Sequence, residues 1–219
     1  MAADHGRVVM VAGATGRVGR EILAALLADK TVSSVHSVGR RELPLKHPKL
    51  VQHVVDFSAL PALPKVDECF IALGTTIKVA GSKEAFRAVD LKAVEAVALA
   101  ARAAGATKVG VVSAMGADSQ SAIFYNRVKG EMETSLARMG FESLVIARPS
   151  MLSGERGALN QPTRPGEQLG LLFTKALKPL IPSNYRSIAA HDVAQALVRA
   201  VKAGTPGVET LLSGAMQAA

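Results

Sequence analysis

The stretch Gly13-Ala14-Thr15-Gly16-Arg17-Val18-Gly19 is the feature that most restricts the architecture of this chain. An apolar run over 7–12 precedes it, and a helical pattern follows it as far as Ala28. This order predicts a β-strand, a glycine turn and a helix. The glycines let the backbone approach a pyrophosphate, and the amino end of the helix offers partial positive charge. We therefore expect all seven residues to contribute to a dinucleotide site.

The rest of the chain repeats the alternation of strand and helix. Further strands are predicted at 35–39, 50–55, 68–73, 108–113, 142–147 and 208–212. Helices are predicted over 82–104, 122–139 and 191–201. This alternation implies an α/β fold with a doubly wound parallel sheet. We expect a single domain over 1–219, in which the irregular segment 151–186 caps the substrate.

Composition and charge narrow the classes of partner. The chain has 219 residues, 49% of them hydrophobic, which is enough for one sizeable core. Its formal net charge is +8, but the basic residues are scattered and no aromatic residues alternate with them. This argues against a nucleic-acid partner and for an anionic small ligand, although a basic surface without a ligand is an equal alternative.

The remaining sequence signals concern location and metals. Cys69 is the single cysteine and cannot form an intrachain disulfide, and the first residues show no secretory pattern, so a cytoplasmic location is expected. No apolar stretch is long enough to cross a bilayer, although 169–181 has the pattern of a membrane-surface segment as well as that of a packed lid. The five histidines show no paired ligand spacing, so no metal is expected.

The residues at the end of the second predicted strand indicate which nicotinamide cofactor the site prefers. A fold selective for NAD places an acidic residue there, whereas this chain has Gly39-Arg40-Arg41. A guanidinium can bind the 2′-phosphate of NADP through paired, charge-assisted hydrogen bonds. Arg40 and Arg41 therefore predict NADP(H) in preference to NAD(H).

Two later strand ends carry residues suited to the same cofactor. Asp56-Phe57 follows the third strand, where a carboxylate can accept from the adenine amino group and an apolar ring can cover the base. The small residues of Leu73-Gly74-Thr75-Thr76 follow the fourth strand and would let the backbone pass close beneath the riboses. Asp90, in the next helix, fits either polar support of the site or helix surface, and we favour the surface.

Three residues further along predict the chemistry. Ser113 ends the fifth predicted strand, and Tyr125 and Lys129 are four positions apart, on one face of a helix. The pKa of a free tyrosine is about 10, and a nearby ammonium lowers it by favouring the phenolate. Ligands of parallel α/β sheets bind beyond the carboxyl ends of the strands. The three side chains are therefore expected to form a catalytic set for proton transfer.

These residues resemble the short-chain dehydrogenase/reductase superfamily, in its atypical or extended branch with Gly-x-x-Gly-x-x-Gly. The chain is similar to the Tat-interacting-protein oxidoreductase family and its bacterial relatives, and the similarity rests on 73–76, 85–90, 113–118, 124–131, Arg148-Pro149 and 164–167. The resemblance implies a Rossmann fold that binds NADP(H), with Ser113, Tyr125 and Lys129 as the catalytic set. It also places Arg148 and Pro149 among the cofactor-binding residues.

Three functions follow from this resemblance and from the residues. The leading hypothesis is an NADP(H)-dependent oxidoreductase that reduces a carbonyl or oxidises an alcohol on a small molecule. The first alternative is a non-catalytic NADP(H) sensor that controls a protein partner or a homodimer. The second alternative is a nucleotide-sugar epimerase or dehydratase. Arg40-Arg41 and the short C-terminal portion argue against that second alternative.

Overall fold

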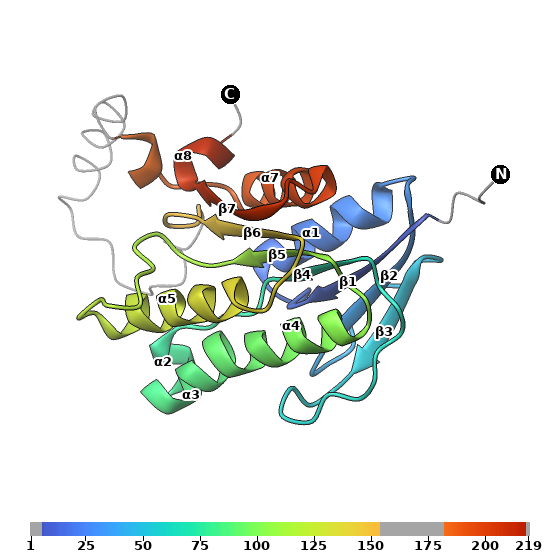
Figure 1. Cartoon of the computed structure of the whole chain (residues 1–219), viewed down its shortest axis with the longest axis horizontal. Helices are drawn as coiled ribbons and strands as arrows, with labels where there is room; N and C mark the ends of the chain where they lie inside the picture. The colour runs from blue at the N-terminus through green and yellow to red at the C-terminus, as the bar shows by residue number, and fades with distance from the viewer. Residues whose placement is uncertain (1–5, 154–181, 218–219) are drawn as a thin grey trace, which may run out of the picture.

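The computed structural model describes residues 6–153 and 182–217, which form one seven-stranded sheet flanked by helices (Figure 1). The strand order is β3-β2-β1-β4-β5-β6-β7, and every neighbouring pair is parallel. The strands are β1 (Arg7–Ala12), β2 (Val32–Gly39), β3 (Leu50–Val54), β4 (Glu68–Ile71), β5 (Lys108–Val112), β6 (Ser143–Arg148) and β7 (Gly207–Leu212). The predicted doubly wound parallel sheet of a Rossmann-type fold is confirmed.

Helices follow β1, β4, β5, β6 and β7, whereas β2, β3 and β4 are joined to one another by described residues that form no helix. The helical elements are α1 (Arg17–Ala28), α2 (Ile77–Ala80), α3 (Lys83–Arg87), the π-helical turn η1 (Ala88–Ala93), α4 (Val94–Ala103), α5 (Phe124–Ala137), the 3₁₀ turn η4 (Ser183–Tyr185), α7 (Ala190–Ala203) and α8 (Ser213–Met216). The long helix predicted over 82–104 is thus three consecutive pieces, with a π turn in the middle. A π turn accommodates an extra residue, and such turns are frequent at functional sites.

The sheet is covered on both faces, which is why the strands β1, β4, β5 and β6 are mostly apolar and buried (Figure 1). On one face α1 and α7 pack against Val9, Val11 and Phe70. On the other face α4 and α5 pack against Met10, Val109 and Ile146. This layered burial fixes the carboxyl ends of all the strands at one edge of the sheet, where the connecting segments form the site.

Gly110 lets a helix approach the centre of the sheet closely. A Cβ atom placed on Gly110, in β5, would lie 2.7 Å from Val201 Cγ2 and 3.1 Å from Leu197 Cδ1. Both of those side chains are fully buried on α7. The helix therefore packs directly against the backbone of a central strand.

The predicted segment 151–186 is described only at its two ends. Ser153 N–H donates to Ile188 O at 2.7 Å and Ile188 N–H donates to Met151 O at 3.1 Å, so the ends are joined beside β6. The predicted membrane-surface segment 169–181 lies outside the described residues. Among the described residues, no helix is both long and apolar enough to span a membrane.

Candidate functional site

The turn between β1 and α1 is built on two close backbone contacts. Gly13 has φ +89°, and a Cβ atom at Gly13 would lie 2.5 Å from the carbonyl of Ala72. A Cβ atom at Gly19 would lie 2.1 Å from Gly13 O. Neither position tolerates a side chain without moving backbone. The first turn of α1 carries no acidic residue, and among the described residues no side chain caps its amino end. This end suits an anionic group such as a pyrophosphate.

A cavity of about 530 Å³ opens beside this turn, along the carboxyl ends of β1, β2 and β4. Ten of the predicted cofactor residues line it: Gly13, Ala14, Thr15, Gly16, Arg40, Arg41, Asp56, Phe57, Leu73 and Gly74. The volume and the elongated set of lining residues fit a dinucleotide.

The other predicted cofactor residues do not line this cavity. Val18 is in the core, and Gly19 packs against the backbone of Gly13. The Thr76 hydroxyl caps α2 by accepting from Val79 N–H at 3.1 Å. Pro149 O accepts from Met115 N–H at 2.9 Å. Arg17 donates to the carbonyl of Ser153 and so joins the first turn of α1 to the segment that follows β6.

The end of the cavity beside β2 is rich in cations. Arg40 and Arg41 are exposed after β2, and Lys92 lines the cavity from η1. Sequence analysis did not identify Lys92, because nothing in the sequence tells which face of the 82–104 helix meets the second strand end. Asp56 lies in the same region, and its pKa is held below the usual range because its carboxylate accepts from Ser58 N–H at 2.9 Å.

Lys129 lies next to the cavity, close to Gly74, and is paired with Asp90. Its ammonium lies 2.6 Å from Asp90 Oδ1, and both side chains are almost fully buried. Oδ2 of Asp90 accepts from Thr75 N–H at 2.9 Å, whereas the contact of Oδ1 with the ammonium is an ion pair without hydrogen-bond alignment. A Cβ atom on Gly74 would lie 3.4 Å from Asp90 Oδ1 and 3.8 Å from Lys129 Nζ. Gly74 therefore leaves the ion pair close to the cavity.

The expectation that Asp90 lies on the helix surface is wrong. Its exposure is 0%, and it sits in the π turn with its carboxylate facing Lys129 on α5. One sequence signal was available: Phe86, Asp90 and Val94 are spaced by four, and the two apolar members are buried. A charged residue at the centre of a buried helical stripe indicates a buried partner of opposite charge.

Tyr125 lies in the first turn of α5, one turn from Lys129. Its half-buried ring packs against Phe86, with ring centroids 5.4 Å apart. The predicted arrangement of phenol and ammonium on one helical face is therefore present in the structure.

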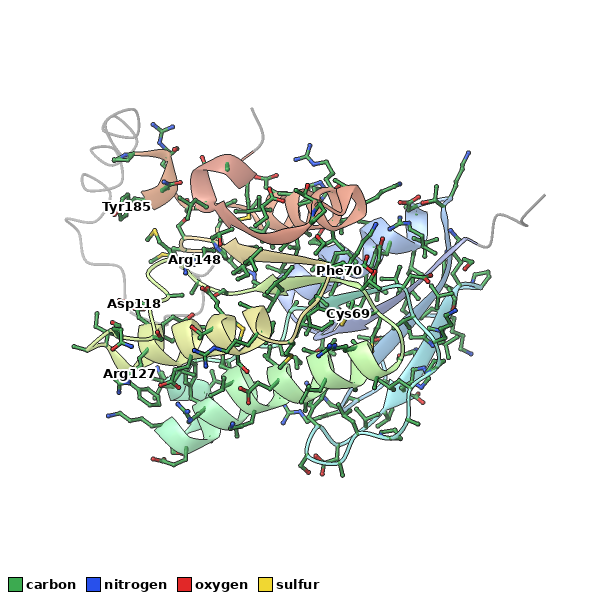
Figure 2. The ribbon with its side chains drawn as sticks, viewed as in Figure 1. Cys69, Phe70, Asp118, Arg127, Arg148 and Tyr185 are labelled. Carbon is green, nitrogen blue, oxygen red and sulfur yellow. The ribbon has the colours of Figure 1, made fainter. Side chains whose placement is uncertain are left out.

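Ser113 lies at the end of β5 and contacts a different part of the same helix. Its hydroxyl donates to Glu133 Oε1, and Arg148 Nη2 and Nε lie 2.5 Å from Oε2 and 3.1 Å from Oε1 of the same carboxylate. The hydrogen bonds that Arg148 donates to Glu133 raise the pKa of the guanidinium, against the opposing effect of burial. Arg148 thus binds a protein carboxylate, and Glu133 is a site residue that the sequence did not reveal. Figure 2 shows Arg148 beside the end of β6.

Comparison with known proteins agrees with this geometry. The pattern of the NAD(P)H-binding family matches residues 13–203. The chain belongs to this family. Rat protein HTATIP2 is 33% identical over 210 residues, covering 93% of this chain and 85% of its own. A protein named fmp52, mitochondrial, from Emericella nidulans is 35% identical over 179 residues, covering 77% of this chain and 75% of its own. These relatives agree with the resemblance to the Tat-interacting-protein family found in the sequence.

Solved structures of other proteins have a similar fold. A short chain dehydrogenase family protein from Francisella tularensis superposes with a TM-score of 0.67 at 14% identity, covering 96% of this chain and 98% of its own. UDP-N-acetylglucosamine 4-epimerase from Methanobrevibacter ruminantium gives 0.68 at 16% identity, covering 94% and 76%. At such identities the similarity concerns the fold alone.

Proposed function

We propose that this family member binds NADP(H) in preference to NAD(H) and uses it to reduce a carbonyl compound or to oxidise an alcohol. The observation that supports the cofactor preference is the group of three cations, Arg40, Arg41 and Lys92, around the end of the cavity beside β2. A 2′-phosphate there would meet guanidinium groups where an NAD-selective site has a carboxylate. The turn at Gly13 and Gly19 leaves room for the pyrophosphate.

The proposed chemistry depends on residues in the first two turns of α5. The bound nicotinamide would give or accept a hydride. Tyr125 would give a proton to the substrate oxygen in reduction and take it back in oxidation. Lys129 would hold the nicotinamide ribose and stabilise the phenolate, and its ion pair with Asp90 close to Gly74 supports this role. The Ser113 hydroxyl, which was expected to orient the substrate oxygen, donates to Glu133 in the structure and is given no step in this chemistry.

A titration of the purified protein with NADPH and NADH, followed by nicotinamide fluorescence, tests the cofactor proposal. We expect NADPH to bind at least about tenfold more tightly, as one charge-assisted contact to the 2′-phosphate requires. Equal affinities would remove the preference. Consumption of NADPH in a panel of aliphatic and aromatic aldehydes and ketones then tests the reaction.

A second candidate function is that of a cofactor-gated regulatory protein. It is supported by the bond from Arg17 to the Ser153 carbonyl, which connects the cofactor turn to the start of 151–186. In this case NADPH binding would alter the protease sensitivity of that segment, and no carbonyl would be turned over. An unchanged digestion pattern would argue against this candidate.

The cellular location is a further proposal. The cytoplasmic expectation rests on the sequence alone, whereas the names of the fungal relatives place those proteins in mitochondria. Fractionation of cells, with detection of this chain in each fraction, decides between the two locations. The small-molecule substrate and an association with a protein partner or a second copy of the chain stay predictions.

A further inference from the structure

Ser113 and Arg148, from the ends of two neighbouring strands, both donate to the buried carboxylate of Glu133. Glu133, on the third turn of α5, is 7% exposed, and Ser113 at the end of β5 is 5% exposed. Oε1 of Glu133 accepts from the Ser113 hydroxyl and from Arg148 Nε, and Oε2 accepts from Arg148 Nη2. We call these three residues the Glu133 latch. The latch joins the carboxyl ends of β5 and β6 to α5.

The latch uses the one proton that Ser113 can donate. A serine hydroxyl has a single O–H, and an ionised carboxylate only accepts hydrogen bonds. Arg148 donates to both oxygens of this carboxylate, so Glu133 acts as an acceptor toward the Ser113 hydroxyl as well. The Ser113 hydroxyl is therefore not available as a donor to a substrate carbonyl unless the buried bond to Glu133 breaks.

The position of the latch along α5 is consistent with this. Glu133 is eight residues beyond Tyr125, which corresponds to about 12 Å along the helix axis. A substrate oxygen bound by two donors must lie about 3 Å from each of them. The hydroxyl of Ser113 contacts the helix two turns away from the phenol, on the side of the strand ends.

We propose that Glu133 is a positioning residue that fixes α5, and with it Tyr125, against β5 and β6, and that Ser113 belongs to this latch and does not donate to the substrate oxygen. The kinetic part of this inference rests on the proposed oxidoreductase function. The structural part concerns the coupling between Ser113 and Glu133 and holds whether or not the protein turns over a substrate.

A double-mutant cycle on stability tests the structural part. Ser113→Ala and Glu133→Gln should each lower the melting temperature by about 3 °C or more, and the double variant should lose clearly less than the sum. Ser113→Cys, which keeps the volume but donates weakly, replaces Ser113→Ala if that variant does not fold. Ser143→Ala is the matched control, because Ser143 is equally buried and its hydroxyl has no hydrogen-bond partner among residues 6–153 and 182–217. If the decreases in melting temperature of the two single variants add up in the double variant, Ser113 and Glu133 are not coupled and the latch is contradicted.

Kinetics at a temperature well below melting test the positioning part. We expect Glu133→Gln to lower kcat about tenfold by displacing Tyr125, and Ser113→Ala to change kcat less than about threefold. NADPH affinity should be unchanged in both, since neither residue lines the cofactor cavity. A hundredfold loss in Ser113→Ala with an unchanged melting temperature would show that Ser113 acts on the substrate. If the wild type shows no turnover, the proposed function fails and the stability cycle still decides on the latch.

Discussion

The Lys129 ammonium lies 2.6 Å from Asp90 Oδ1, and the side chains are 4% and 0% exposed. Two charges removed from water in this way stabilise each other only as a pair. The same carboxylate accepts from Thr75 N–H, so it connects the loop after β4 to the helix that carries Tyr125. The ion pair therefore has a structural role in addition to its place beside the cofactor cavity.

Replacing Asp90 by Asn should leave a buried positive charge without a counter-charge. We expect the free energy of unfolding to fall by about 3–5 kcal/mol, although Asn can still accept from Thr75 N–H. Chemical denaturation measures the loss. The matched control is Lys92→Gln, which removes an ion pair with Glu95 at the surface, where the Lys92 side chain is 66% exposed. This control should lower the free energy of unfolding by at most about 1 kcal/mol. Similar losses in the two variants would contradict the assignment.

Charge reversal at Arg40 should separate the two cofactors. In Arg40→Asp the new carboxylate repels the 2′-phosphate, so we expect NADPH to bind at least about tenfold more weakly while NADH changes less than about threefold. Nicotinamide fluorescence gives both affinities. Arg138→Asp changes the net charge equally at an exposed position away from the cavity, and it should leave both affinities unchanged. Parallel losses for both cofactors would remove Arg40 from 2′-phosphate recognition.

Loss of the Tyr125 hydroxyl should abolish the proton transfer. Tyr125→Phe keeps the packing against Phe86, so we expect unchanged NADPH affinity and a loss of at least about a hundredfold in kcat. Tyr185→Phe is the same substitution at a position that is 67% exposed, on η4 (Figure 2), and should retain activity. Full turnover in Tyr125→Phe would exclude the phenol from the chemistry.

A methyl group at Gly13 should close the pyrophosphate turn. Gly13→Ala adds a Cβ atom 2.5 Å from the Ala72 carbonyl, whereas Gly81→Ala has the same φ of +89° and meets nothing within 4 Å. Both variants carry backbone strain of about 1 kcal/mol. Only Gly13→Ala should also shift the backbone and weaken NADPH binding, as isothermal titration would show. Equal binding in the two variants would mean that the close contact is not needed.

Asp29 should contribute stability that acid removes. A hydrogen bond from Lys202 is the main reason why the pKa of Asp29 is far below its ordinary value, and Thr31 adds to this against the opposing effect of burial. A depressed pKa contributes stability above the unfolded pKa of about 3.9, and this contribution is lost as the pH falls below that value. Asp29→Asn should therefore cost about 1–3 kcal/mol at pH 7 and progressively less below about pH 4.

Unfolding curves of wild type and Asp29→Asn at several pH values measure the contribution of Asp29 to stability. Burial raises the pKa of Glu68, which acts in the opposite direction on acidification and affects wild type and variant alike. Glu142→Gln removes an exposed carboxylate for which the described part of the chain shows no ion pair, and it should change stability little. A constant difference between wild type and Asp29→Asn from pH 7 to pH 3 would contradict the expectation.

The sequence predicted β1, β4, β5 and β6 well because they are short apolar runs bounded by polar residues. β2 begins three residues before the predicted strand, because Ser33 and Ser34 interrupt its apolar pattern. β1 agrees in both bounds, and β4 ends two residues early because Ala72 and Leu73 already bend into the cavity wall. The glycine turn and Arg40-Arg41 could also be predicted from the sequence, because local spacing fixes their positions relative to the strand ends.

Contacts between distant elements could not be predicted in this way. Glu133 and Ser113 are 20 positions apart and meet only because α5 returns along the sheet. Asp90 reaches Lys129 from the π turn, a deviation from regular helix that spacing arguments do not anticipate. Partners of charged residues depend on which helices share a face, and this depends on the whole topology.

Gly110 also bears on how sequences of this fold diverge. Because α7 packs directly on the backbone of β5 at this position, a larger residue there needs smaller side chains at 197 and 201. Among related proteins, these three positions should therefore covary, and a change at one of them alone should be rare. Substitutions that would be conservative elsewhere in the sheet are therefore expected at this position only as compensated pairs.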